Sequence, residues 1–427
     1  VHRVQTIIMD YRITPPEEIL EATASLPRSK SIITRAMVMA AIASKTYTGP
    51  LAEVCDDTAT LAGILSRPLQ GTIDVGPAGT AMRFLCALCA ATEGADCLLT
   101  GSERMLRRPI GPLVETLRSL GADIAYEGAD GFPPLRIKGR RLTGGEAEID
   151  GGTSSQFISA LMMVAPLMSA PLKIRLLGDV SSRPYIAMTA EMMRRRGIDV
   201  EMDLDSVTVP DTPYRYRSPE DDDEADWSAA AFWYEIAALT AGWVTIPGLR
   251  QRSLQGDSAS AELFERLGVL TEYGDEGAEL SATPDLYSRF DADLSDMPDA
   301  VPALAVTAAM AGIPFRISGI GSLHDKECDR IEALIAELAK LGMLAETEEY
   351  GTVLSWDGSR RPISELPVFD TYGDHRMAMA LAPVAVFVPG IVIRDAGVVA
   401  KSYPGFWDDL RRAGFTVEDA EEASAEE

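Results

Sequence analysis

The sequence predicts an α/β protein that is built from repeated units and divided into two domains. Three observations support this prediction: a glycine that recurs at a regular spacing, a helix-like apolar pattern before it, and an alternating apolar pattern after it. The glycines lie 76, 71, 74 and 72 residues apart, at Gly121, Gly197, Gly268, Gly342 and Gly414. A chain of 427 residues therefore holds six units of this size, which indicates two domains of three units each.

Each repeated glycine is expected to end a helix, because glycine adopts the left-handed conformation of a helix C-cap without steric penalty. After Gly121, the stretch Ala122–Tyr126 alternates apolar and polar residues and predicts a strand; Ile198–Met202 follows Gly197 in the same way. The first unit lacks a matching glycine. Its predicted helix, Ala59–Leu65, runs into a serine, an arginine and a proline, so we expect a shortened copy.

The stretch Asp211–Asp226 is the best domain boundary, because it is rich in Pro, Asp and Tyr and poor in periodic apolar residues. The alternating segment Gln5–Asp10 is expected to pair with the second half of the chain. The connection between domains would then be double, with hinges near Leu26–Arg28 and near Glu224–Trp227. The predicted domains are 1–27 plus 225–427 and 28–224. A cleft between two such domains is a natural ligand site.

The net charge is −26, from 39 Lys plus Arg against 65 Asp plus Glu. This balance disfavours nucleic acid and anionic membranes as partners, since affinity for both depends on basic patches. An anionic ligand would need a local basic cleft. No apolar run reaches the roughly 18 residues of a membrane helix, and the N-terminal residues lack a signal-peptide pattern. We expect a soluble, cytoplasmic monomer that binds small molecules.

The five cysteines are expected to be free thiols. Cys86 and Cys89 form a C-x-x-C pattern, but they lie in the apolar run Phe84–Ala91, and no second Cys or His pair accompanies them. Core packing is therefore favoured over metal or redox chemistry. The three histidines show no metal-ligand spacing. We expect neither a metal nor a cofactor.

The segment Ser29–Arg35 places two hydroxyls and two cations directly before the helix-forming run Ala36–Ala43. A helix start offers unpaired N–H groups and a partial positive charge, which favour an anion. Lys30 supplies a mobile point charge, and Arg35 supplies a planar fork suited to a carboxylate or phosphate. Considered alone, the segment is also typical of a capped surface helix with solvated charges.

Similar polar clusters precede further helices. They are Gly76–Arg83, Arg104–Ile110, Thr153–Gln156, Ser182–Tyr185, Asp296–Asp299, Lys326–Arg330 and Asp374–Arg376. Each one alone has a structural interpretation: Thr80 could cap the helix after it, and Asp299 could cap a helix over Ala300–Ala311. Independent capping does not predict so many cations in an acidic chain. One interdomain cleft that binds a highly anionic ligand set explains them together.

In their order along the chain, these motifs resemble the 5-enolpyruvylshikimate-3-phosphate synthase family of enolpyruvyl transferases. The matching segments are Ser29–Arg35, Ala78–Arg83, Arg108–Ile110, Ser154–Phe157, Ser182–Tyr185, Pro298–Asp299, Lys326–Glu327 with Arg330, Asp374–Met379 and Val399–Lys401. The resemblance implies two domains, each of three βαβαββ units in a pseudo-threefold arrangement, that close around the substrates. It also implies transfer of the enolpyruvyl group of phosphoenolpyruvate to the 5-hydroxyl of shikimate 3-phosphate, with release of phosphate, in aromatic amino acid biosynthesis.

The resemblance also implies site residues, matched position by position. Those for shikimate 3-phosphate are Lys30, Ser31, Arg35, Ser154, Ser155, Gln156, Ser182, Tyr185, Asp299, Ser322 and Lys326. Those for phosphoenolpyruvate are Lys30, Gly79, Arg108, Gln156, Arg330, Arg376 and Lys401. Catalytic roles fall to Asp299, Glu327, Lys30 and Lys401. The chemistry agrees, because the reaction needs two carboxyl groups, one for the attacking hydroxyl and one for the methylene carbon.

Three positions depart from the family pattern. Pro77 and Ser322 stand where the family usually has asparagine, and each change removes at most one polar contact, so we expect altered affinity. Phe84 replaces a proline, which is expected to reshape the adjacent helix and the fit of glyphosate, a competitor of phosphoenolpyruvate in this family.

Two other functions compete with this interpretation. The enolpyruvyl transferases that act on UDP-N-acetylglucosamine share the fold, but they usually carry a reactive cysteine in a mobile loop, and Arg104–Arg108 contains none. A non-catalytic relative that keeps the fold as a binding module would be expected to lose the charged set, and here the set is present.

Overall fold

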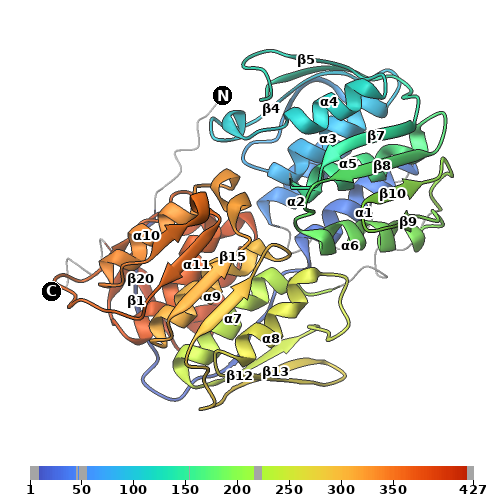
Figure 1. Cartoon of the computed structure of the whole chain (residues 1–427). Helices are drawn as coiled ribbons and strands as arrows, with labels where there is room; N and C mark the ends of the chain where they lie inside the picture. The colour runs from blue at the N-terminus through green and yellow to red at the C-terminus, as the bar shows by residue number, and fades with distance from the viewer. Residues whose placement is uncertain (1–8, 45–46, 48–54, 153, 216–223, 421–427) are drawn as a thin grey trace. The chain divides into compact units, whose positions relative to one another are not determined.

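The computed structural model describes residues 9–44, 47, 55–152, 154–215 and 224–420. These residues form two compact units (Figure 1). Unit 1 takes the described residues up to Pro27, Ala225–Arg252 and those from Asp257 on; unit 2 takes those in Arg28–Glu224 and Ser253–Gly256. Unit 1 thus combines the N-terminal strands with the second half of the chain.

The described residues form five four-stranded sheets that share one pairing pattern, in which a parallel pair is followed by two antiparallel pairings. Unit 2 holds two of them: β3 (Gln70–Asp74), β4 (Asp96–Thr100), β6 (Leu135–Lys138), β5 (Asp123–Tyr126); and β7 (Gly145–Asp150), β8 (Leu172–Leu177), β10 (Ser206–Val209), β9 (Glu201–Met202). Unit 1 holds three: β18 (Val368–Phe369), β19 (Ile391–Ile393), β1 (Tyr11–Thr14), β20 (Thr416–Asp419); β12 (Val269–Tyr273), β13 (Gly277–Ala282), β11 (Trp243–Pro247), β2 (Glu21–Thr23); and β14 (Phe290–Asp293), β15 (Phe315–Ser318), β17 (Val353–Trp356), β16 (Glu346–Glu348).

The α-helices alternate with these strands and complete five βαβαββ units in the described chain. In unit 2 they are α1 (Lys30–Ile42), α2 (Asp56–Leu65), α3 (Gly79–Ala91), α4 (Gly111–Ser119), α5 (Ser155–Val164) and α6 (Arg183–Arg194). In unit 1 they are α7 (Trp227–Thr240), α8 (Ser260–Glu265), α9 (Val301–Met310), α10 (Arg330–Lys340), α11 (His375–Leu381) and α12 (Phe406–Arg412). The first predicted unit contains residues 48–54, which lie outside the described residues.

The five repeated glycines all have positive φ, between 74° and 95°, which confirms the predicted helix caps. At Gly121 the backbone N–H donates to Arg118 O at 2.9 Å, and the N–H of Ala122 donates to Leu117 O at 3.0 Å. This is the Schellman pattern, and it requires the left-handed conformation at the glycine. Helix α2 ends at Leu65 with Ser66 as its cap, as predicted for the unit without a glycine.

Prolines make two helices shorter than the sequence indicated. The apolar run Phe157–Met168 predicts one continuous helix, but α5 ends at Val164 and continues as the 3₁₀ turn Ala165–Leu167. The apolar run Met377–Val388 also predicts a helix, but α11 ends at Leu381, before the 3₁₀ turn Ala382–Val386. Each of these turns contains a proline, which lacks the N–H that the helix would need.

The start of the described chain pairs with the second half, as predicted. Strand β1 lies between β19 and β20, with Ile13 opposite Ile391 and Val417. The strand begins at Tyr11, later than the expected segment Gln5–Asp10, of which residues 5–8 lie outside the described residues.

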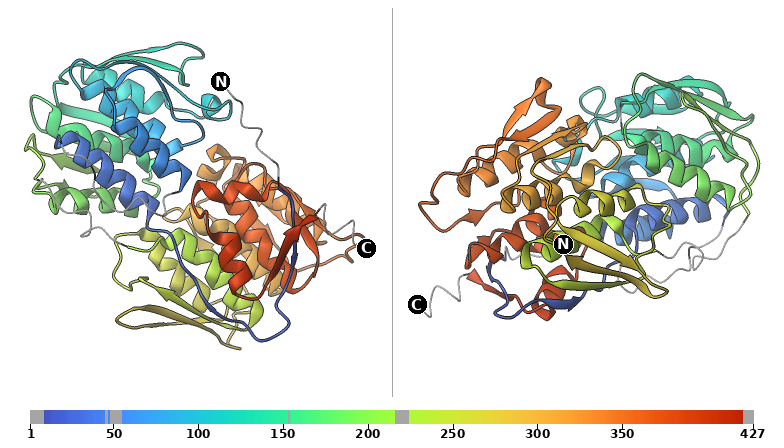
Figure 2. Two further views of the ribbon diagram at one scale, coloured as in Figure 1. Left: turned by 180° about the vertical axis from the view of Figure 1, so that it is seen from behind. Right: turned by 60° about the horizontal axis from the view of Figure 1, so that its bottom comes forward.

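Each unit has its core between helices and sheets, and in both the helices lie inside the sheets (Figures 1 and 2). Every residue of α9 and α11 is buried, and α3 buries twelve residues. Helices that are apolar on all sides must lie within a core. The strands instead alternate: in β8 the pattern of burial is strictly every second residue, so one face packs on helices and the other meets solvent.

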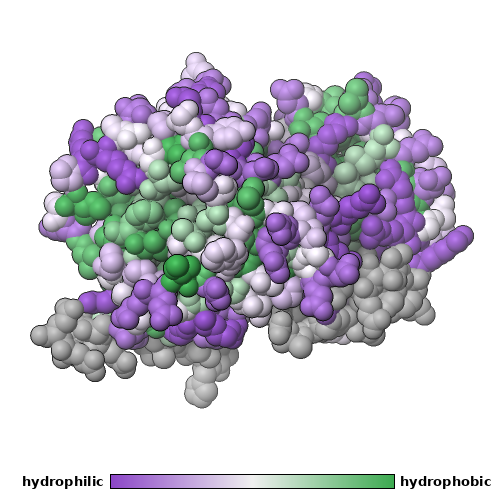
Figure 3. Space-filling model, turned by 90° about the horizontal axis from the view of Figure 1, so that it is seen from below, coloured by the Kyte–Doolittle hydropathy of each residue, from purple (hydrophilic) through white to green (hydrophobic). Residues whose placement is uncertain are grey.

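The face seen in Figure 3 mixes hydrophilic and apolar residues. Trp243 and Leu270 are 56% and 44% exposed on the outer face of one sheet, where both pair with Ser281 of β13. Within the described part of the chain, no helix is long and apolar enough to cross a membrane.

Candidate active site

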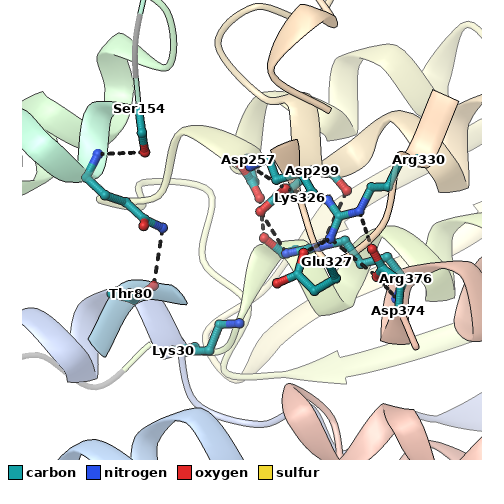
Figure 4. A network of polar contacts seen from close by, with 12 residues as sticks. Lys30, Thr80, Ser154, Asp257, Asp299, Lys326, Glu327, Arg330, Asp374 and Arg376 are labelled. Carbon is teal, nitrogen blue, oxygen red and sulfur yellow. Dashed lines mark hydrogen bonds and ion pairs between the residues drawn. The ribbon is translucent and has the colours of Figure 1, made fainter. Parts of the chain in front are cut away.

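A cluster of ion pairs in unit 1 centres on Arg330, the first residue of α10 (Figure 4). Its side chain is 1% exposed. Nε donates to Asp374 Oδ2 at 2.7 Å, Nη1 to Asp299 Oδ1 at 2.8 Å and Nη2 to Glu327 Oε2 at 2.9 Å. One guanidinium thus fixes three carboxylates, two of which are the expected proton-transfer groups.

Asp299 contacts three cations and caps no helix. Besides Arg330, its carboxylate pairs with Lys326 Nζ at 3.2 Å and Arg376 Nη2 at 3.0 Å. It lies in the 3₁₀ turn Pro298–Ala300, and the turn and α9 both lack a side-chain cap. The cap interpretation is therefore wrong, because the carboxylate points to side chains from α10, α11 and the preceding loop and not to backbone N–H groups.

The pKa of Asp299 is held well below its ordinary value. Burial alone would raise it, but the positive charges of Arg376, Lys326 and Arg330 outweigh burial. The carboxylate is therefore ionised at neutral pH and able to accept a proton. Any anion that draws Arg376 or Lys326 away would raise the pKa of Asp299 and make it a stronger base.

Glu327 is bound on both oxygens. Oε1 accepts from Lys401 Nζ at 2.7 Å, and Oε2 accepts from Arg330. Lys401 ends the 3₁₀ turn Ala396–Lys401, which follows β19. Asp374 caps α11 by accepting from Arg376 N at 2.9 Å, so one buried carboxylate sets the positions of two cations. The candidate residues of unit 1 are thus brought together, with Ser322 in the adjacent turn Gly321–Asp325.

In unit 2, Lys30 begins α1 and its Nζ lies 3.1 Å from Asp57 Oδ2. The Asp57 side chain is 5% exposed, and it belongs to the first turn of α2. Lys30 is therefore held at a helix start, where its ammonium and the helix dipole can act on the same anion.

Arg35 is 1% exposed and does not present a fork to solvent. It donates from Nε to Thr189 Oγ1 at 2.7 Å, from Nη1 to Ser31 O at 2.9 Å and from Nη2 to Ser159 Oγ at 3.2 Å. The Phe84 and Tyr185 rings flank its guanidinium. Burial lowers the pKa of Arg35 to about 10, and the electrostatic interaction with Tyr185 offsets part of this lowering. Arg35 thus ties three helices together around Ser31.

Two arginines lie against Gly79 at the start of α3. A Cβ placed on Gly79 would lie 2.6 Å from Arg108 Nη1 and 2.7 Å from Arg83 Nη1. Arg83 also donates to Gly79 O at 3.0 Å. Both arginines are buried, so a larger residue at this helix start would have to displace their guanidinium groups.

Ser154 caps α5, since its Oγ accepts from Gln156 N at 3.4 Å. Gln156 Nε2 in turn donates to Thr80 Oγ1 at 3.2 Å, which joins the starts of α5 and α3 (Figure 4). Thr80 does not cap α3, whose N-cap is Ala78, so that expectation is wrong. Ser155 is buried in the first turn of α5. Thr153, expected in this cluster, lies outside the described residues.

The remaining candidates of unit 2 lie at the start of α6. Ser182 is its N-cap residue in the left-handed conformation, with φ of 54°, and Tyr185 packs its ring on Arg35. Phe84, the departure from the family pattern, is fully buried beneath the same guanidinium. The ring that stands in place of proline therefore packs against Arg35.

Three residues of these clusters were not singled out from the sequence, namely Asp57, Ser159 and Thr189. Ser159 and Thr189 lie one helical turn after Ser155 and Tyr185, so helical spacing could have placed them on the same face. No local pattern distinguishes Asp57 from other acidic residues at helix starts.

All five cysteines are free, and four of them, including Cys86 and Cys89, are buried, which confirms core packing. The described residues contain no group of three or more His, Cys, Asp or Glu able to hold a metal.

Comparison with known proteins gives the family. The family model for EPSP synthase (3-phosphoshikimate 1-carboxyvinyltransferase) matches residues 58–410. A 3-phosphoshikimate 1-carboxyvinyltransferase from Bacteroides fragilis is 45% identical over 415 residues, covering 97% of this chain and 100% of the relative. The chain belongs to the EPSP synthase family. Another family member, from Syntrophobacter fumaroxidans, is 36% identical and covers 92% of this chain and 97% of its own length.

Solved structures agree on the fold. EPSP synthase from Acinetobacter baumannii superposes with a TM-score of 0.70 at 20% identity, over 96% of this chain and 100% of that chain. The enolpyruvyl transferase NikO from Streptomyces tendae superposes with a TM-score of 0.69 at 17% identity, over 96% of this chain and 99% of that chain. These neighbours confirm the enolpyruvyl transferase fold that the sequence motifs implied.

Proposed function

We propose that this member of the EPSP synthase family transfers the carboxyvinyl group of phosphoenolpyruvate to the 5-hydroxyl of shikimate 3-phosphate and releases phosphate. The observation that supports it is the ion-pair cluster of unit 1, in which Arg330 holds Asp299 and Glu327 beside Lys326, Arg376 and Lys401. Two carboxylates with different cationic partners suit two separate proton transfers.

Asp299 takes the proton of the attacking hydroxyl. Its three cations keep it ionised before substrate arrives. When a substrate phosphate or carboxylate engages Lys326 and Arg376, the carboxylate loses part of that stabilisation and its basicity rises. The same ligands that complete the complex therefore prepare the base.

Glu327 handles the proton at the methylene carbon of phosphoenolpyruvate. Lys401 lies against its other oxygen and is placed to exchange that proton with it. All three nitrogens of Arg330 already donate to carboxylates, so its expected role as a phosphoenolpyruvate ligand depends on the second N–H of Nη1 or on the opening of one of those contacts. Its role in the described arrangement is to position both proton-transfer groups.

In unit 2, the anion-binding groups are Lys30, Gly79, Arg108, Ser154, Ser155 and Gln156. Lys30 is the first residue of α1, Gly79 that of α3 and Ser155 that of α5, so three helix starts and their dipoles contribute. Arg35 acts through Ser31 and Tyr185, because its own nitrogens are occupied within the core. Ser182, Tyr185 and Ser322 complete the proposed set for shikimate 3-phosphate.

The test is a phosphate-release assay with phosphoenolpyruvate plus either shikimate 3-phosphate or UDP-N-acetylglucosamine. The proposal expects release with shikimate 3-phosphate and none with the nucleotide sugar. Release only with UDP-N-acetylglucosamine would assign the other known enolpyruvyl acceptor, and none with either would overturn transferase function.

We also propose that the chain works as a cytoplasmic monomer, with no nucleic-acid or membrane partner. The net charge of −26 supports the absence of a nucleic-acid or membrane partner, since it disfavours binding to anionic surfaces. Light scattering should then give a mass near 46.0 kDa.

A further inference from the structure

His324 closes a loop around two of the proposed active-site residues. Its ring Nδ1 lies 2.6 Å from Asp329 Oδ2, five residues along the chain. Lys326 and Glu327 lie between these two positions. The side-chain contact therefore fixes both ends of the segment that carries a proposed substrate-binding cation and a proposed proton-transfer group.

The other ring nitrogen has an acceptor as well. Nε2 lies 3.0 Å from the carbonyl oxygen of Gly351, in the 3₁₀ turn Glu349–Gly351 that joins β16 to β17. Gly351 has φ of +85°, and a Cβ on it would lie 2.6 Å from His324 Nε2, so the approach needs glycine. The imidazole thus links the segment that carries Lys326 and Glu327 to the turn between β16 and β17.

Both contacts require the protonated ring. A carbonyl and a carboxylate only accept hydrogen bonds, and a neutral imidazole has a single N–H. The imidazolium donates from both nitrogens and satisfies both partners. Loss of the proton would remove one contact, to either Asp329 or Gly351.

Asp329 connects this ring to the centre of the active site. Its Oδ1 accepts from the backbone N–H groups of Ile331 and Glu332, both at 3.2 Å, and so caps α10. Helix α10 begins at Arg330, which holds Asp299, Glu327 and Asp374.

We propose that His324, in its imidazolium form, is a positioning residue that orders the segment from Lys326 to Arg330 and makes the reaction depend on its proton. This inference rests on the proposed function, but it concerns a residue outside the substrate-binding and proton-transfer set. His324 acts through Asp329 and Gly351, and it touches neither substrate in the scheme above.

The charges around the ring favour its protonation. Burial lowers the pKa of His324, but the hydrogen bond and charge of Asp329, the Gly351 carbonyl and the charge of Asp325 together raise it above the ordinary 6.5. The acidic groups of the facing turn, Glu348 and Glu349, pair with Arg316. Since the folded-state pKa is raised, the contacts are complete below about pH 6.5 and are lost as pH rises through the folded-state value.

The first test needs no activity. The chain has three histidines, so the imidazole signals in an NMR titration can be assigned by difference, using His324→Arg. The proposal expects the His324 signal to titrate above pH 6.5. A midpoint at or below 6.5 would overturn it.

The second test compares pH profiles of kcat. We expect the kcat of wild type to fall as pH rises through the titration midpoint of His324. His324→Arg keeps the positive charge at all these pH values, so its kcat should not show this fall. His324→Gln should be slower by roughly 10- to 100-fold at low pH, the size of a small displacement of catalytic groups. The control Tyr350→Ala changes a fully exposed side chain on the same turn and should match wild type.

If kcat of His324→Arg falls with rising pH in the same way as that of wild type, the fall belongs to another group, such as Lys326. That result would overturn the proposal. The activity of the wild-type chain at pH 6.5 tests the proposed transferase function separately. The role of His324 can therefore fail while the transferase function stands.

Discussion

Arg330 Nη1 lies 2.8 Å from Asp299 Oδ1, although the two residues are 31 positions apart and belong to different helical elements. The same guanidinium donates to Glu327, so a single buried side chain sets the spacing of both proposed proton-transfer groups. Charge-assisted contacts of this kind are strong and directional. This relationship makes Asp299 the most informative residue to change.

Asp299→Asn keeps the shape of the side chain but cannot accept a proton. We expect kcat to fall about 10²–10⁴-fold. Affinity for shikimate 3-phosphate should be retained, because removing a negative charge does not disfavour an anionic ligand. The melting temperature should fall, since three cations lose their counter-charge. Phosphate release, calorimetry and thermal unfolding measure these three effects.

Asp291→Asn is the matched control, because Asp291 pairs with Arg289 at an exposed site of the same unit. It should leave rate and melting temperature near wild type. An Asp299→Asn variant that keeps more than about a tenth of the wild-type rate would contradict the role of Asp299 as the base.

Gly79→Ala tests the anion site at the start of α3. The new methyl group would meet the guanidinium nitrogens of Arg108 and Arg83 at less than 3 Å, and flexible side chains will move before the backbone does. We expect the KM for phosphoenolpyruvate to rise well above that of wild type, while affinity for shikimate 3-phosphate changes little. Arg108→Ala should act in the same direction, at a cost of about 2–5 kcal/mol in phosphoenolpyruvate binding.

Gly63→Ala is the control, because a Cβ on Gly63 in α2 meets no atom within 4 Å. It should leave both KM values unchanged. Equal weakening of both substrates by Gly79→Ala would show that these arginines do not form the phosphoenolpyruvate site.

The sequence predicted the repeats well for a physical reason. The cap glycines need a left-handed backbone that other residues rarely adopt, so Gly121 and its four counterparts mark helix ends regardless of what surrounds them. The C-terminal ends of α5 and α11, which lie next to prolines, were predicted less accurately from the sequence. The periodic apolar pattern continues past the point where the proline removes a helical hydrogen bond.

The sequence singled out Asp299, Glu327 and Arg330 but did not predict the contacts among them. Its local sequence allowed Asp299 to be read as a helix cap, because sequence shows only its neighbours, whereas Arg376 reaches it from 77 residues away. Arg35 was expected to face a ligand, yet Ser159 and Thr189 enclose it, and they come from helices more than 100 residues along the chain. Such contacts depend on how the repeated units pack together, which local patterns do not contain.

The buried carboxyl group of Glu235 should make the stability of the protein depend on pH. It is fully buried in α7, and neither of its carboxyl oxygens has a hydrogen-bond partner among the described residues. Burial raises its pKa well above the ordinary value. The folded state therefore holds a proton that the unfolded state releases near pH 4.3, and stability falls as pH rises from there towards the folded-state pKa.

Glu235→Gln should remove this loss. The melting temperature of the variant should exceed that of wild type by an amount that grows between pH 5 and pH 8, because each pH unit in that window costs wild type up to about 1.4 kcal/mol. Glu272→Gln changes an exposed glutamate of the same unit and should show no such trend. A difference from wild type that is equal at both pH values would contradict the buried proton.

Shikimate 3-phosphate is predicted to draw the two units together. The proposed ligands come from both, with Lys30 and Ser154 in unit 2 and Asp299 and Lys326 in unit 1. A ligand favours a closed state only through contacts that the open state lacks. Small-angle scattering should therefore show a smaller radius of gyration at saturating shikimate 3-phosphate. Lys326→Ala, which removes a unit 1 contact, should weaken this change, whereas Lys173→Ala, at an exposed position on β8, should preserve it. An unchanged radius at saturation would place all of the binding contacts on one unit.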